Sequence, residues 1–318
     1  MTRGRCWGVY RELAHSPGRE TDDAEILRST ARELEARGFD VELKSPDELS
    51  ADVETSGFGG GGELSSRGVT SGYGTAGEAV PNLFVMCERI PIVERLSTWE
   101  RRGARIVNRP SGIRNTDRER TIALFRRHEV SFPDSVLVGT RSGDASFRGA
   151  CWVKRADVHA TEAGDVSFAG SAEELETNLE RLRGRGIARA VVQEHVPGDL
   201  IKFYGVAGLA DDDDRPSWFQ WFYHRDQKLS NHSFDRDALA LATSRAAAAL
   251  GLEVYGGDAI VSAGGAISVI DLNAWPSFAL FRPVAAAKIA ALLAERFSRA
   301  RTTIRTPTGA LTMTGESE

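Results

Sequence analysis

This sequence contains few cysteines. It also lacks an excess of basic residues, and it has no long apolar run. The 318 residues include three cysteines, Cys6, Cys87 and Cys151, which lie in short apolar segments and lack the paired spacing of a disulfide framework or a zinc site. We therefore expect reduced, buried thiols. The formal net charge of −5 provides no basic field for nucleic acid, so a nucleic-acid partner is not expected.

No apolar run reaches the length of a membrane-spanning helix. Arg3 and Arg5 are not followed by the continuous apolar core of a signal peptide, so we expect a cytoplasmic protein without a membrane partner. A composition of 41% hydrophobic and 27% charged residues is ordinary for a soluble enzyme, and the length suffices for two or three lobes. A homo-oligomer is compatible with this composition.

The first part of the chain alternates strand and helix patterns. Residues 5–10 predict a strand, 21–38 a helix with Gly38 at its C-terminal end, and the next apolar segment a second strand. Residues 82–88 and 92–103 repeat the strand and helix, followed by the strand-like "ARIVN". Residues 1–110 are therefore predicted to form an open α/β domain on the substrate side.

The remaining chain predicts a mixed α+β region. We expect a central lobe at 111–190, a C-terminal lobe with a metal site at 191–300, and a disordered tail at 301–318. The glycine-rich segment 57–78 lacks the Gly-Lys-Ser/Thr ending of a P-loop, which favours a flexible surface loop, with a lid as the alternative.

Acidic and amide side chains gather on a predicted hairpin near the end of the chain. In "VIDLNAWPSF" (269–278), Asp271 and Asn273 are two residues apart and project on one side of a strand that should end before Pro276. Asp258 lies on the other arm of the hairpin. These oxygens suit Mg²⁺, or Mn²⁺, bound together with a polyphosphate, whereas the alternative is a pair of turn-capping side chains.

A nucleotide site also needs a cation for the phosphates and partners for the base and ribose. Lys154, at the polar end of an apolar strand, can reach the α and β phosphates, or it can be a surface lysine. In "QEHVPGD" the main chain can bind adenine and Asp199 can accept a ribose hydroxyl, unless the segment merely connects two strands. Lys202 and Arg225, expected on later strands, can contact the terminal phosphate.

The order of these segments resembles the ATP-grasp superfamily over about residues 105–295. The matching segments are "IVNRPSGIRNTDRERT", "WVKR", "VVQEHVPGD", "IKFYGV", "YGGDAIV" and "VIDLNAWPSF". The resemblance implies two α+β lobes that hold Mg-ATP between them. The residues that it assigns are Lys154 for phosphate, Gln193, Glu194, His195 and Val196 around adenine, Asp199 for ribose, and Asp258, Asp271 and Asn273 for Mg²⁺.

The sequence departs from the superfamily pattern at three places. Asp117-Arg118 stands where many members have Asp-Lys, and "RADVHATEAGD" replaces a glycine-rich cover between two central strands. These two departures concern groups that would contact the nucleotide phosphates. The third is the final metal ligand, Asn273 with Asp271 before it, a variant that still supplies two oxygen donors.

Three functions remain open on the sequence. Most members of the superfamily are ligases, so we expect a carboxylate to be activated by ATP and captured by an amine, with Lys154, Lys202 and Arg225 stabilising the transferred phosphoryl group. The spacing of Lys154, His159 and Thr161 in "VKRADVHAT" also resembles that of ATP-grasp inositol polyphosphate kinases, and "LIKFYGV" and "VIDLNAWP" fit that branch too. The third alternative is a nonenzymatic nucleotide-binding protein.

The substrate is expected to be a small molecule or a peptide. Candidate residues for its selection are Arg89 in the first domain, His159 in the central lobe and Ser277 after the last strand. For His159, an exposed loop histidine without a role is the alternative.

Overall fold

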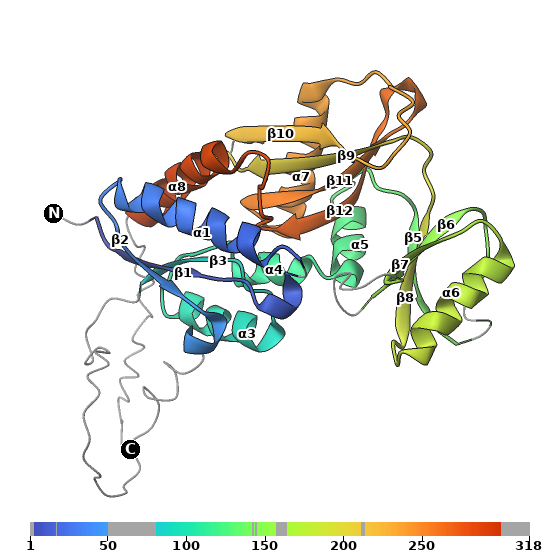
Figure 1. Cartoon of the computed structure of the whole chain (residues 1–318), viewed down its shortest axis with the longest axis horizontal. Helices are drawn as coiled ribbons and strands as arrows, with labels where there is room; N and C mark the ends of the chain where they lie inside the picture. The colour runs from blue at the N-terminus through green and yellow to red at the C-terminus, as the bar shows by residue number, and fades with distance from the viewer. Residues whose placement is uncertain are drawn as a thin grey trace, which may run out of the picture.

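The computed structural model of the chain describes residues 3–16, 18–49, 81–141, 143, 145–156, 164–210 and 214–299 (Figure 1). The glycine-rich segment 57–78, His159 and the tail 301–318 lie outside the described residues. The described residues include no helix that is both long and apolar enough to cross a membrane.

The first sheet is parallel and has the strand order β2-β1-β3-β4. Its elements are β1 (Arg5–Val9), α1 (Glu20–Glu35), β2 (Asp40–Lys44), β3 (Asn82–Val85), α3 (Ile90–Arg101) and β4 (Ile106–Val107). Trp7 and Val9 of β1 pack with the apolar side of α3, whereas Cys6 packs with that of α1. The strands are apolar on both sides because helices cover both faces of the sheet.

The helices α4 (Pro110–Asn115) and α5 (Arg118–Arg127) lead into the central, antiparallel sheet, whose order is β5-β8-β6-β7. Its elements are β5 (Ser135–Gly139), β6 (Cys151–Arg155), β7 (Val166–Ala169), α6 (Ala172–Gly184) and β8 (Arg189–Glu194). Leucines of α6 pack on Cys151, Val153 and Ala190. Strand alternation therefore turns Trp152 and Lys154 toward the opposite face of the sheet.

The third sheet is antiparallel and has the order β10-β9-β11-β12. Its elements are β9 (Asp199–Val206), β10 (Trp218–Tyr223), α7 (Arg236–Leu250), β11 (Val254–Val261), β12 (Ile267–Ala274) and α8 (Arg282–Ser298). The helix α7 packs with the sheet face that carries Phe203 and Leu272, and α8 packs with the face that carries Tyr204. One end of the second face is thus covered by α8.

The first and third sheets are joined by buried contacts. The helix α1 lies along α8 (Figure 1). Asn108 is fully buried, and its side chain donates to Val254 O at 2.7 Å and accepts from the amides of Glu253 and Val254 at 2.8 and 2.9 Å. The side chain of Asn108 therefore acts as a peptide-like bridge between the first domain and the beginning of β11.

This architecture confirms the predicted fold class, an open α/β domain followed by two α+β lobes. The exact domain limits stay a prediction. The strand β8 lies wholly in the central sheet, and the chain passes to the third sheet between Glu194 and Asp199. Arg225, which was expected on a strand, lies instead in the turn that follows β10.

Candidate functional site

Polar side chains occupy the part of the third sheet that α8 leaves uncovered. Asp271 and Asn273 project from the same face of β12, as their spacing predicted. Asp258 of β11 lies directly opposite Asp271 in the sheet, and a bulge follows it immediately. Gly256 lies opposite Asn273. The structure therefore brings two carboxylates and one amide together on one sheet face.

Lys202 extends this polar face to a third strand. It lies opposite Asp258 in the β9–β11 register, and its Nζ is 2.8 Å from Asp258 Oδ1. The side chains of Lys202 and Asp258 are 30% and 25% exposed, so the pair remains accessible to a ligand. Lys202 therefore lies beside the carboxylates. Arg225, in contrast, is exposed, and among the described residues it forms no hydrogen bond or ion pair with Asp258 or Asp271.

Lys154 approaches the same carboxylates from the central sheet. It is 9% exposed, and its Nζ donates to the main-chain oxygen of Ile270 at 3.3 Å. Burial lowers the pKa of Lys154, against the attraction of Asp271 and Asp258. Lys154 therefore lies between the two lobes and faces the carboxylates.

A cavity lies between the central and third sheets at this point. Its lining combines cations, an amide and aromatic carbons, and includes Arg118, Phe125, Lys154, Gln193, Ile270 and Asp271. A cavity with a few convergent polar groups in an otherwise apolar wall is typical of small-molecule sites. It opens between two lobes, where a ligand can contact both.

Electrostatics suit the carboxylate cluster to a divalent cation. Burial raises the pKa of Asp258, and the neighbouring charge of Asp271 raises it further, whereas Lys202 and Lys154 oppose this effect. A hard cation with oxygen ligands would relieve the repulsion between the two carboxylates. The described residues contain no cluster of three or more His, Cys, Asp or Glu side chains that could hold a metal, so such an ion would take further oxygens from a ligand or water.

The end of β8 lines the cavity, and the chain leaves the central sheet directly after it. Gln193 is buried in the cavity wall and donates through Nε2 to Ser135 Oγ at 3.1 Å. The amides of Glu194 and His195 donate to Asp134 and Ala150. In contrast, within the part of the chain that the structure describes, the amide of Val196 donates to no protein acceptor. Val196 thus offers a donor suited to the edge of a base.

Asp199 has a different environment from the one expected of a ribose ligand. It is fully buried, and its two oxygens accept from the amides of Ser230 at 2.6 Å and His232 at 2.8 Å. Burial opposes ionisation, but these amides outweigh it and lower the pKa of Asp199. The carboxylate therefore fixes the loop before α7, and this geometry does not support its predicted contact with ribose.

The predicted substrate residues do not form one cluster with the carboxylates. Arg89 is exposed at the beginning of α3, where its guanidinium pairs with Asp47 Oδ1 at 2.8 Å. Ser277 is buried beside Tyr204 in the segment that follows β12. His159 lies outside the described residues, so its predicted role is not tested.

Two arginines that the motif reasoning did not assign lie at or near the site. Arg118 begins α5 after its N-cap Asp117, lines the cavity, and donates to the main-chain oxygen of Arg155. Its place directly after Asp117 was a visible signal. Arg11 donates to the main-chain oxygens of Ala274 and Trp275, at the end of β12. The sequence carried no signal for a contact between positions so far apart.

Comparisons with known proteins agree with this arrangement. No known family matches the sequence, and no curated protein matches it. Among solved structures, a RimK domain ATP-grasp protein from Sphaerobacter thermophilus has a TM-score of 0.59 at 16% identity, over 91% of this chain and 99% of that one. The ATP-grasp ligase PsnB, solved with a minimal precursor, Mg and ADP, has a TM-score of 0.59 at 17% identity, over 92% and 98%.

D-alanine–D-alanine ligase from Bacillus anthracis has a TM-score of 0.63 at 12% identity, over 92% of this chain and 97% of that chain. The predicted resemblance to inositol polyphosphate kinases finds no support among these structures. Nearly the whole of each of these proteins is matched, including the two lobes that enclose the cavity. The chain therefore has the ATP-grasp fold.

Proposed function

We propose that this protein is a Mg-ATP-dependent ligase that activates a carboxylate as an acyl phosphate and joins it to an amine. The observation that carries the proposal is the meeting of Lys154 from one lobe with Asp258 and Asp271 from the other. A cation for phosphate and oxygens for a divalent ion thus face the same cavity.

The nature of the similar structures supports a ligase. PsnB, a ligase, was solved with a precursor peptide and AMPPNP, and D-alanine–D-alanine ligase was solved with ATP. We infer that the acceptor here is an amino acid or a peptide. The kinase alternative depended on His159, which lies outside the described residues, so no described contact favours it.

We assign the nucleotide contacts from the cavity wall and from the segment that follows β8. The amide of Val196 would donate to adenine, with Gln193 beside it, and Lys154 would bind the α and β phosphates. Arg118, at the entry of α5, is suited to the same phosphates and occupies the position where many members of the superfamily have lysine.

Asp258, Asp271 and Asn273 are the proposed ligands of the divalent cation. Bound Mg²⁺ would neutralise charge on the β and γ phosphates during transfer. Lys202, which pairs with Asp258, can exchange this partner for an oxygen of the terminal phosphate. Arg225 lies outside this cluster, and we assign it no contact with the phosphoryl group.

The reaction then needs positioning more than a protein nucleophile. The substrate carboxylate attacks the γ phosphorus and ADP leaves, after which the amine attacks the acyl carbon, phosphate leaves and the amine proton passes to solvent. The two lobes exclude water from the acyl phosphate, while Lys154 and Lys202 hold the oxygens that gain charge.

Product analysis tests this proposal. The protein would be incubated with Mg-ATP and a panel of amino acids, small peptides and inositol phosphates, and ADP, free phosphate and coupled product would be measured. We expect ADP and phosphate in equal amounts together with an amide. A phosphorylated hydroxyl without free phosphate would instead establish a kinase, and the lack of any Mg-ATP binding would refute both.

The variant Asp271→Asn tests the site itself. It should lose at least 90% of metal-dependent turnover, because one carboxylate of the cation site is removed while the shape of the side chain is kept. Asp226→Asn, which changes an exposed carboxylate in the turn after β10, is the matched control and should retain full activity.

A further inference from the structure

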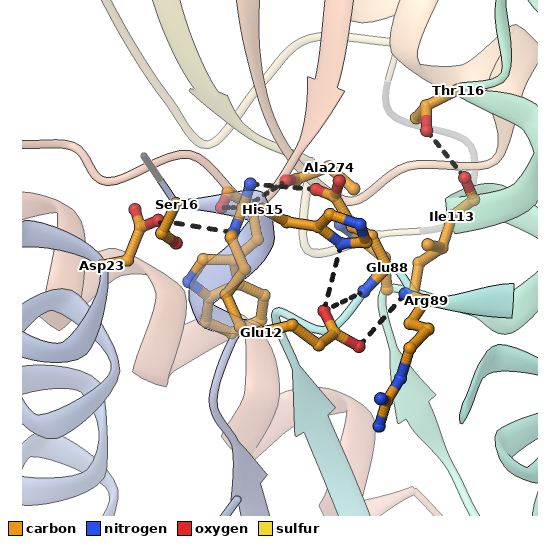
Figure 2. A network of polar contacts seen from close by, with 12 residues as sticks. Glu12, His15, Ser16, Asp23, Glu88, Arg89, Ile113, Thr116 and Ala274 are labelled. Atoms are coloured by element: carbon orange, nitrogen blue, oxygen red, sulfur yellow. Dashed lines mark hydrogen bonds and ion pairs between the residues drawn. The ribbon is translucent and has the colours of Figure 1, made fainter. Parts of the chain in front are cut away.

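The segment after β1 reaches across the molecule to the end of β12. Figure 2 shows Glu12, His15 and Ser16 of this segment gathered with Asp23 of α1 and Glu88 around the Ala274 end of β12. This meeting point lies at the carboxyl ends of β1 and β3, the edge of an open parallel sheet at which ligands commonly bind.

Arg11 makes the contact with β12 itself. One of its terminal nitrogens donates to the main-chain oxygen of Trp275 at 2.6 Å and to that of Ala274 at 3.1 Å. The side chain of Arg11 is only 12% exposed. A buried guanidinium with fixed partners has little freedom to move, so the two carbonyl groups are held in one position.

Acidic groups of the first domain hold Arg11 on its other sides. Its other terminal nitrogen is 2.9 Å from Glu88 Oε1, and its Nε is 3.4 Å from Asp23 Oδ2. Asp23 is itself held by Ser16 Oγ, which donates to it at 2.6 Å. The guanidinium is therefore anchored to α1 and to the segment between β3 and α3, and not only to the segment that carries it.

The chain that Arg11 holds bends directly after the proposed cation ligands. Trp275 follows Asn273 by two residues and has a φ of 41°, a conformation that is unfavourable for a bulky residue. Its fully buried ring stacks on Phe84 with centroids 6.0 Å apart, and its amide donates to Val254 O at 3.0 Å. Arg11 thus helps to hold a bend whose backbone conformation is unfavourable for a bulky residue.

We propose that Arg11 is a positioning residue for the divalent-cation site. By fixing the carbonyl groups of Ala274 and Trp275, it sets the register and the tilt of the last residues of β12, from which Asn273 and Asp271 project. This inference rests on the proposed function, because it assigns the cation to those two side chains. It adds that the first domain, which holds none of the proposed cation ligands, controls the geometry of the site.

A substitution series measures this effect on cation binding. Mn²⁺ would be titrated in the presence of saturating AMPPNP and followed by electron paramagnetic resonance, which needs no turnover. For Arg11→Met we expect about 10-fold weaker Mn²⁺ binding, the size typical of residues that orient metal ligands through another group. For Arg11→Lys we expect an intermediate loss, because a lysine cannot hold both carbonyl groups and both acids at once.

Arg105→Met is the matched control. Arg105 also ties the first domain to main-chain oxygens of the C-terminal lobe, at Arg296, Phe297 and Arg299, but it does so at the far end of α8. It should lower the melting temperature and leave Mn²⁺ affinity within about twofold of the wild type. Affinity for AMP, which does not require the cation, should stay unchanged in all three variants.

The outcomes separate the two proposals. If the wild type binds Mn²⁺ with AMPPNP and Arg11→Lys binds it equally well, the positioning role is refuted while the proposed function stands. If the wild type binds no Mn²⁺ with the nucleotide, both are refuted. An equal loss of affinity in Arg105→Met would show a general effect of interdomain loosening and would also overturn the positioning role. Should Arg11→Met fail to fold, Arg11→Lys decides.

Discussion

Lys154→Met separates the contribution of this lysine to stability from its contribution to ligand binding. Methionine keeps the unbranched stem of the side chain and removes the charge. Burial lowers the pKa of Lys154, which means that the folded protein disfavours the protonated amine relative to the unfolded chain. In the absence of a ligand, the positive charge of Lys154 therefore lowers the stability of the folded wild type.

The expected gain in stability follows from that balance. The substitution removes the weak hydrogen bond to Ile270, at 3.3 Å, and the attraction of Asp271 and Asp258. It also removes the energetic cost of burying a charged amine, which is the larger effect. Because the pKa of Lys154 is lowered even with the attraction of both carboxylates included, the charged amine is a net cost to the fold, and we expect its removal to stabilise the protein by about 1 kcal/mol. For a chain of this length this corresponds to a rise of about 2 °C in melting temperature.

The pH dependence of this difference has a definite sign. Below the lowered pKa of Lys154 the amine is protonated in both the folded and the unfolded chain, so the full penalty is present. As pH rises through that pKa toward the ordinary value of 10.5, the folded protein sheds the proton first and the wild type gains stability. The difference between wild type and Lys154→Met should therefore narrow under alkaline conditions.

The expected loss in binding is larger. Each hydrogen bond from a charged group to a phosphate contributes about 1.5–3 kcal/mol, so Lys154→Met should weaken Mg-AMPPNP binding by roughly 10- to 150-fold. Calorimetric titration measures the binding, and thermal unfolding without ligand measures the stability. Lys288→Met, which removes an exposed lysine of α8, should change neither. Unchanged nucleotide affinity, or a melting temperature several degrees lower, would refute the reasoning.

The other predictions concern buried groups. Cys6, Cys87 and Cys151 are buried, so the folded protein should not react with a thiol reagent at pH 8, whereas the unfolded chain should react at all three sites. Burial, followed by the negative charges of Asp40 and Glu35, raises the pKa of Cys6 from 9.0 to about 12. The stability that Cys6 contributes should be present below pH 9.0 and lost as pH rises toward 12, as alkaline denaturation would show. Asn108→Ala should destabilise the protein by about 3 kcal/mol in urea unfolding, because three buried hydrogen bonds are broken; a change below about 1 kcal/mol would contradict this. Gly257→Ala would place a methyl carbon 2.1 Å from a main-chain oxygen of β12, and it should abolish metal-dependent nucleotide binding.

Local patterns predicted much of the fold. The helix expected at 21–38 is α1, Glu20–Glu35, and Gly38 beyond its end has the positive φ of 87° that its role required. The hairpin that carries Asp258 and Asp271 is present, because alternation and the turn residues between the strands were both visible. The face shared by Asp271 and Asn273 followed from the two-residue period of a strand alone.

What the sequence could not predict depends on contacts between distant segments. Asp199 looked like a free carboxylate beside a base-binding loop, but the amides of residues 230 and 232 surround it. Arg225 was placed on a strand because the preceding residues are β-rich, whereas β10 ends at Tyr223. Arg11 and Trp275 are 264 residues apart, and no local pattern links two such positions.

The buried bridge of Asn108 and the packing of α1 along α8 join the first domain and the third sheet into one unit. The central sheet and α6 stand apart from that unit at one end of the molecule (Figure 1). If the protein binds nucleotide as proposed, we expect the central lobe to move as a whole during nucleotide exchange, about the segments that connect it to that unit, near α5 and at Val196–Gly198. During this motion the proposed cation ligands would keep their positions, whereas Lys154 would move with the central lobe. The distance between Lys154 and the carboxylates would therefore change as the lobes open and close.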